Sequence, residues 1–137
     1  MAIRKIVTKD DPVLHAKCKP VEHFDKKLWD LLDDMAETLY KAQGLGLAAP
    51  QVGIRRRIAV IDVGDENGLI ELINPVILKS SGKQRDVEGC LSCPDQWGYV
   101  VRPNKCTVRA QNRNGEFFEI HLEGLGCRCA CHEIDHL

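Results

Sequence analysis

No stretch of this 137-residue chain is hydrophobic over the roughly 20 residues that a membrane-spanning helix needs, although 44% of its residues are apolar. The opening residues, MAIRKIVTKDDP, also lack the hydrophobic centre of a secretory signal and the Arg- and Ser-rich composition of a transit peptide. We therefore expect a protein that does not cross a membrane and that stays in the cytoplasm.

An excess of one charge is missing as well. The chain has 19 basic and 20 acidic residues, a net charge of −1, so its composition does not favour binding to nucleic acid. The run Arg55–Arg57 is more typical of a solvated turn before a strand than of a phosphate site. Internal repeats, low-complexity tracts and Pro/Gly-rich linkers are also absent, which predicts a single domain over residues 1–137.

Cysteine, in contrast, is abundant, with seven residues. An odd number of cysteines cannot be fully paired, and a reducing cytosol favours free thiols or metal ligands. Thiolates are therefore candidate ligands wherever a metal-binding pattern occurs.

One helix is expected over residues 25–44, with Asp25 as its N-cap and Gly44 as its end. Apolar residues spaced by three and four positions predict one buried face. These residues are Leu28, Leu31, Leu32, Met35, Ala36, Leu39 and Tyr40.

Strands are expected in the second half of the chain. The segments RRIAVIDV (56–63) and LIELINPVIL (69–78) are rich in Val and Ile, and Pro75 predicts that the second is an edge strand or a broken one. KCTVRAQN (105–112) and EFFEIHLE (116–123) flank Asn114–Gly115, a strong hairpin signal. A last helix is expected from about Leu125. A helix, then strands, then a helix predicts an α+β fold with a mostly antiparallel sheet.

The last residues, CHEIDHL (131–137), carry an HExxH motif. On a helix, His132 and His136 share one face and can bind the same ion. Glu133 lies beside the first histidine, where it can take a proton from a water whose pKa the ion lowers. We expect the mostly antiparallel sheet to pack around this metal-binding helix.

Two histidines do not complete a metal site, so a further ligand must come from upstream. The segment EGCLSCP (88–94) offers Cys90, which would leave a fourth position open for water, as in catalytic sites. Cys93 is its rival, because the C-x-x-C pair could instead form a structural zinc site with Cys127, Cys129 or Cys131. That alternative is weaker, because the C-x-C-x-C spacing puts alternate residues on different sides of a helix.

The segment GLGLAAPQVG (44–53) has two interpretations. It could simply be a helix end followed by a turn. Alternatively, Gly44 and Gly46 let the backbone approach a ligand closely, and Gln51 offers an amide donor to a developing oxyanion.

Together, GLGLAAPQ (44–51), EGCLS (88–92) and HEIDH (132–136) resemble the three motifs of the peptide deformylases, in the same order and at similar spacing. The resemblance implies removal of the formyl group from N-formylmethionyl nascent polypeptides, near the ribosome, by a protein expected to be a monomer. It implies that Cys90, His132 and His136 hold one divalent ion, Fe²⁺ first and Zn²⁺, Ni²⁺ or Co²⁺ as alternatives.

Further roles follow from the same resemblance. Glu133 would act as the general base and then the acid, and the Gln51 amide and the Leu91 N–H would stabilise the oxyanion. Leu45, Val87 and Leu125 lie beside the motifs, as Gly46 lies within one, and could line a methionine pocket; for the three apolar residues, plain core packing is an equally good interpretation.

The chain departs from the family at two points. Cys131 stands where members usually have glutamine, and members continue past the HExDHL motif, so we expect a short or truncated copy without the C-terminal tail. A zincin-type metallopeptidase and a non-enzymatic structural zinc module remain the alternatives.

Overall fold

The computed structural model of the chain describes residues 2–7, 11–15, 17–90 and 92–137, except for the side chains of residues 15, 86–90 and 93–99. Its elements in chain order are η1 (Pro12–His15), α1 (Lys26–Lys41), β1 (Gly46–Ala48), η2 (Ala49–Val52), β2 (Ile58–Ile61), β3 (Ile70–Ser81), β4 (Gln84–Cys90), β5 (Cys93–Arg102), β6 (Lys105–Gln111), β7 (Phe117–Glu123) and α2 (Gly124–Asp135). The predicted α+β class is confirmed.

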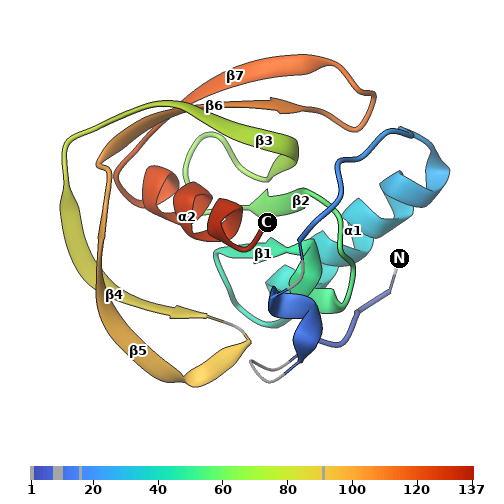
Figure 1. Cartoon of the computed structure of the whole chain (residues 1–137), viewed down its shortest axis with the longest axis horizontal. Coiled ribbons are helices and arrows are strands. Elements are labelled where there is room, and N and C mark those ends of the chain that lie inside the picture. The colour runs from blue at the N-terminus through green and yellow to red at the C-terminus, as the bar shows by residue number, and fades with distance from the viewer. Residues whose placement is uncertain (1, 8–10, 16, 91) are drawn as a thin grey trace.

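The main sheet has the strand order β1-β2-β3-β6-β7, and all of its neighbouring strands are antiparallel. Helix α2 lies at the centre of the molecule and α1 lies toward its edge (Figure 1). Strand β2 shows that the helices cover opposite faces of this sheet. Its residues Ile58 and Val60 pack in the core formed with α1, whereas Ala59 and Ile61 pack in the core formed with α2. The expected packing of the sheet against the C-terminal helix is therefore present.

Small side chains line the contact between α2 and the sheet. Ala48, Ala59 and Ala110 from the strands and Ala130 from the helix are all fully or almost fully buried. Because such side chains hold the backbones only slightly apart, the helix can lie close to β1 and β2. This close approach brings the HExxH motif against the first strand.

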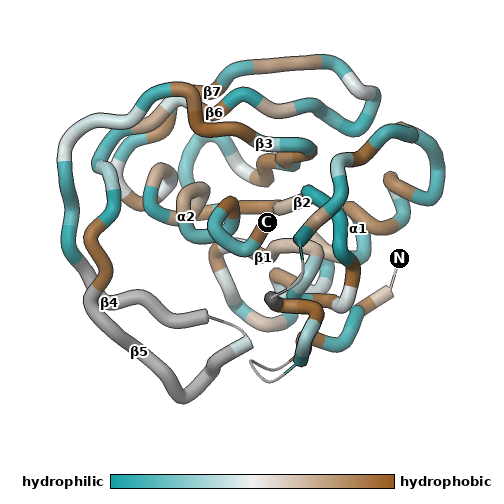
Figure 2. The backbone as a smooth tube through the Cα atoms, viewed as in Figure 1, coloured by the Kyte–Doolittle hydropathy of each residue, from teal (hydrophilic) through white to brown (hydrophobic). Residues whose placement is uncertain are grey.

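Helix α1 begins after Asp25 as its sequence predicts, but it ends at Lys41 and not at Gly44, because Gln43 already takes the left-handed conformation (φ 57°). The Asp25 side chain accepts a hydrogen bond from the Leu28 backbone N–H at 3.2 Å, which satisfies one free donor of the first turn. Hydrophobic and hydrophilic residues alternate along the helix (Figure 2), as expected of an amphipathic surface helix. One residue of the predicted buried face is exposed: Tyr40 is 51% exposed, and its hydroxyl donates to Asp62 Oδ2 at 2.6 Å at the surface.

Strand β3 corrects the prediction of an edge strand, because it is the central strand of the sheet. The predicted interruption is present, since the register with β6 shifts between Ile73 and Val76. Residues 70–73 pair with β2, whereas among the described strands β6 alone pairs with residues 76–81. Pro75 lies where the pairing with β2 stops, so its missing N–H leaves no gap in that ladder.

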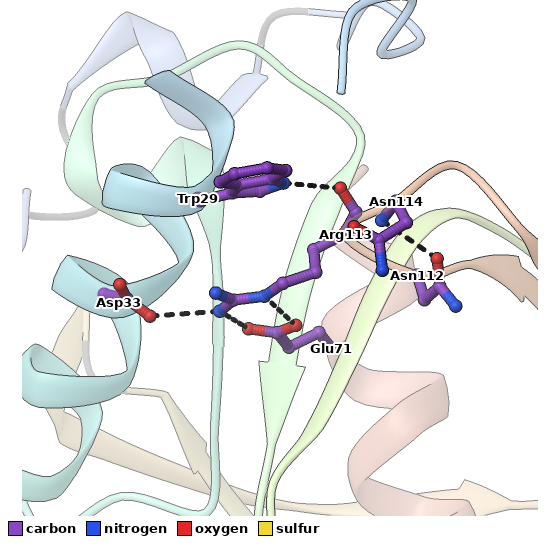
Figure 3. A network of polar contacts seen from close by, with 6 residues as sticks. All are labelled: Trp29, Asp33, Glu71, Asn112, Arg113 and Asn114. Carbon is purple, nitrogen blue, oxygen red and sulfur yellow. Dashed lines mark hydrogen bonds and ion pairs between the residues drawn. The ribbon is translucent and has the colours of Figure 1, made fainter. Parts of the chain in front are cut away.

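The hairpin β6–β7 confirms the Asn-Gly signal, and its tip docks on α1 (Figure 3). The Arg113 guanidinium donates to both carboxylate oxygens of Glu71, at 3.0 and 2.5 Å, and to Asp33 of α1 at 3.0 Å. The Trp29 indole N–H donates to the Arg113 carbonyl oxygen at 2.6 Å. These contacts join three segments that lie far apart in the chain.

We expect Arg113→Ala to lower the free energy of unfolding by about 1–2 kcal/mol, because it removes a two-pronged ion pair that is only partly exposed. Urea unfolding measures the change. Lys27→Ala on the exposed side of α1 is the control, and it should change stability by less than about 0.5 kcal/mol. A loss at Arg113 no larger than that of the control would contradict this role.

Strands β4 and β5 form a separate two-stranded sheet that the sequence did not predict. Two polar contacts connect it to α2: Arg102 forms an ion pair with Asp135, and Arg128 Nη2 donates to the Val100 carbonyl oxygen at 3.1 Å. Within the described part of the chain, no helix is long and apolar enough to cross a membrane.

Candidate metal centre

The HExxH motif lies on the last turns of α2, as predicted. One potential ligand atom from each of His132, Glu133 and His136 lies within 4.8 Å of the others. The two imidazole rings are 5.2 Å apart, centroid to centroid, at an angle of 70°. Although the helix ends at Asp135, the backbone of His136 keeps helical dihedral angles (φ −76°, ψ −12°), so the spacing of four residues still places both rings on one side.

The electrostatics of the centre suit a divalent ion. Burial, together with the nearby imidazole of His132, lowers the pKa of His136 to about 4. Its ring is therefore neutral at physiological pH and keeps the nitrogen lone pair that a metal needs. Glu133 is only 4% exposed, a position in which a carboxylate is rarely found unless it has a partner. Two imidazoles on one side of the helix, beside a buried carboxylate, fit zinc, iron, nickel or cobalt.

Gly46 of β1 lies directly against this carboxylate. A Cβ atom at position 46 would lie 2.7 Å from Cγ and Oε2 of Glu133 and 2.8 Å from Sγ of Cys129. The Cys129 thiol also donates to the Leu45 carbonyl oxygen at 3.3 Å, which ties α2 to the start of β1. The absence of a side chain at Gly46 thus provides the space that Glu133 occupies. This packing explains why a glycine stands at position 46 of the GLGLAAPQ segment.

We expect Gly46→Ala to lower kcat by about 10–100-fold, because the added methyl group must displace Glu133, and errors of about 1 Å in position can cost 10²-fold. Gly126→Ala is the matched control on α2, since its Cβ would lie 3.6 Å or more from its neighbours. Steady-state kinetics of both variants, with metal content measured, tests the prediction. Equal activity of the two variants would show that position 46 tolerates a side chain.

Gln51 is 1% exposed in η2, directly after β1. Its side-chain oxygen accepts a hydrogen bond from the Ala48 N–H at 2.8 Å, so the amide nitrogen points the other way. That nitrogen lies 3.5 Å from Oγ of Ser92, next to the segment that carries Cys90. The first and second sequence motifs therefore meet through the donor end of Gln51.

Several predicted site residues fall outside the described residues. Leu91 is not described at all, and of Cys90 and Val87 only the backbone is. Strand β4 ends at Cys90, whose backbone partner across the hairpin is Cys93. The ligand role of Cys90, the oxyanion role of Leu91 and the pocket role of Val87 stay predictions.

The remaining predicted residues lie on the surface. Leu45 is 45% exposed and Leu125 is 49% exposed, so neither is a core residue. Arg102 forms an ion pair with Asp135, directly before the second histidine. Asp135 is therefore not simply a solvated charge.

A second group of potential ligands was missed in the sequence. Cys106, Cys127 and Cys131 are buried, and their sulfur atoms lie within 4.8 Å of one another. Cys106 belongs to β6, and the other two thiols belong to α2. The i, i+4 spacing of Cys127 and Cys131 was a usable signal, whereas the approach of β6 was not visible in the sequence.

The chain matches the family model described as polypeptide deformylase over residues 3–137. The peptide deformylase of Caldicellulosiruptor bescii is 56% identical over 137 residues, which are 100% of this chain and 81% of that relative. The enzyme of Alkaliphilus metalliredigens is also 56% identical, with 92% of its length covered.

Solved structures agree with this comparison. The peptide deformylase of Legionella pneumophila superposes with a TM-score of 0.94 at 49% identity, over 98% of this chain and 80% of that chain. The enzyme of Thermotoga maritima superposes with a TM-score of 0.96 at 43% identity, over 100% of this chain and 92% of that chain. These comparisons agree with the HExxH motif on α2, with Gly46 of β1 against Glu133 and with the buried Gln51. The chain belongs to the polypeptide deformylase family.

Proposed function

We propose that the chain is a metal-dependent peptide deformylase, which hydrolyses the formamide of N-formylmethionine at the start of newly made polypeptides. The observation that carries the proposal is the buried carboxylate of Glu133 close to the imidazoles of His132 and His136, in a chain of this family. The products are formate and a polypeptide with a free amino terminus.

His132 and His136 would hold the metal, with Cys90 as the third protein ligand. This set leaves a position for water, as catalytic sites require. A divalent ion there supplies Lewis acidity, which allows a water molecule to lose its proton near neutral pH instead of near 15.7. We infer Fe²⁺ as the native ion, with Zn²⁺, Ni²⁺ and Co²⁺ as alternatives, because all of them accept imidazole and thiolate.

Glu133 moves the proton. Its carboxylate accepts a proton from the attacking water, whose oxygen forms the new bond to the formyl carbon. The same side chain then donates that proton to the leaving amine as the C–N bond breaks. The burial of Glu133, which is 4% exposed, favours this shuttle, because it limits the access of bulk water to the carboxylate.

The oxyanion that forms on the formyl oxygen needs donors already in position. The Gln51 amide nitrogen is oriented by the hydrogen bond from Ala48 to the other end of the same amide, so it costs little reorganisation during the reaction. The Leu91 N–H is the second donor in the proposal. Exposed Leu45 and Leu125, with Gly46 and Val87, would contact the methionine side chain.

The surroundings of the reaction are part of the proposal. We infer that residues 1–137 act as one catalytic domain, as a monomer in the cytoplasm, on nascent polypeptides near the ribosome. The substrate is recognised by its formylated methionine, and no contact with nucleic acid is required.

The test is hydrolysis of a formyl-Met peptide, with formate release and metal content measured on the same sample. We expect formate release proportional to bound metal, and no cleavage of internal peptide bonds. Cleavage of an internal bond in a control peptide without a formyl group would support a zincin-type peptidase. Metal binding without either reaction would support a structural zinc module.

A further inference from the structure

The cluster of Cys106, Cys127 and Cys131 lies outside the HExxH centre and has no part in the deformylation mechanism. Their side chains are 5%, 0% and 4% exposed, and all three are free thiols. Three buried sulfur atoms within 4.8 Å of one another are a ligand set without a nitrogen or oxygen donor. Such a set differs in chemistry from the histidine centre on the same helix.

The fold brings these sulfur atoms together from two elements. Cys127 and Cys131 lie one turn apart on α2 and therefore share a face. Cys106 lies on β6, where it pairs with Leu122 of β7 and with Ser80 of β3, in the sheet that this face of α2 covers. The Cys127 thiol donates to the Pro103 carbonyl oxygen at 3.4 Å, just before β6 begins. The third helical cysteine, Cys129, points elsewhere and donates to the Leu45 carbonyl oxygen.

The size of the cluster suits one ion. Metal–sulfur bonds of about 2.3 Å place three sulfur atoms about 4 Å apart around a central ion. Separations of up to 4.8 Å therefore need only a small inward movement. Structural zinc is almost always bound by four ligands, whereas three thiolates in an apolar core suit a soft ion that accepts three.

We propose that Cys106, Cys127 and Cys131 form a second, thiolate-only site that binds one soft monovalent ion of the Cu(I) type. Each thiol that binds the ion releases its proton to solvent. The bound ion joins α2 to β6 one residue before His132, and so holds the helix that carries the catalytic residues against the sheet.

The experiment uses the full chain with its catalytic centre filled with Ni²⁺, so that added copper does not report on that centre. Cu(I) is added without oxygen, in the presence of a competing chelator, and both metals are counted after desalting. We expect one Ni²⁺ and one Cu(I) per chain, and a higher melting temperature than with Ni²⁺ alone. Zn²⁺ offered in the same way should not be retained as a second ion.

Alanine variants assign the site. Cys106→Ala and Cys127→Ala should each lower the Cu(I) affinity at least 10-fold, whereas Cys129→Ala, a thiol on the same helix outside the cluster, should keep it. Circular dichroism checks the fold, and Cys127→Ala is the safer variant because alanine favours a helix. The proposal would be overturned if all variants bound Cu(I) with equal affinity, or if copper bound only by displacing Ni²⁺ from the catalytic centre. It would also be overturned if the cysteines formed a disulfide and no copper was retained.

Discussion

The Glu133→Gln variant is expected to lose about 10²–10⁴-fold in kcat while it keeps its metal, because an amide cannot accept the proton that the reaction moves. Glutamine has nearly the shape of glutamate, so the close contact with Gly46 is preserved and the helix need not shift. Steady-state kinetics with metal content measured on the same preparation separates loss of the base from loss of the ion.

Asp135→Asn is the matched control for that experiment. It removes a carboxylate from the same helix, and one that pairs with Arg102 and is 62% exposed. We expect its activity to stay within a few-fold of the parent, because the Asp135 carboxylate faces solvent and an ion pair with a solvent-exposed partner contributes little. An active Glu133→Gln variant, or one that has lost its metal, would show that this residue is not the base.

Cys90→Ser is expected to cause the second large loss. A hydroxyl is a much poorer ligand than a thiolate for zinc, iron, nickel or cobalt, so metal affinity should fall by more than the roughly 10–100-fold that changes to outer-shell partners cause. Formate release should fall in proportion to the metal that remains. Equilibrium dialysis against a chelator measures the affinity, and the formyl-Met assay measures the activity.

Cys93→Ser is the control for Cys90, because the two residues are backbone partners at the end of the same hairpin. We expect its metal affinity and activity to stay close to those of the parent. Equal damage from both variants would instead favour a structural zinc site that uses the C-x-x-C pair.

Local interactions explain what could be predicted from the sequence. The N-cap Asp25, the apolar stripe of α1 and the Asn-Gly turn between β6 and β7 each act over a few residues. The spacing of His132 and His136 is likewise a property of one helix, so the pair could be found before the fold was known. The motifs resembling the deformylases are short segments too, and their order along the chain indicated the family.

Only the tertiary structure decided how distant segments meet. Pro75 is compatible with a central strand because the pairing with β2 stops just before it, which depends on where β2 begins, at Ile58. The pairing of Arg102 with Asp135 and the meeting of Cys106 with two thiols of α2 depend on how the strands pack around the helix. Gly46 leaves room for Glu133 because β1 and α2 approach within contact distance. The residue types and their local spacing were thus readable from the sequence. The burial of Glu133, the lowered pKa of His136 and the partners of Arg102 and Cys106 were not, because contacts between distant segments produce them.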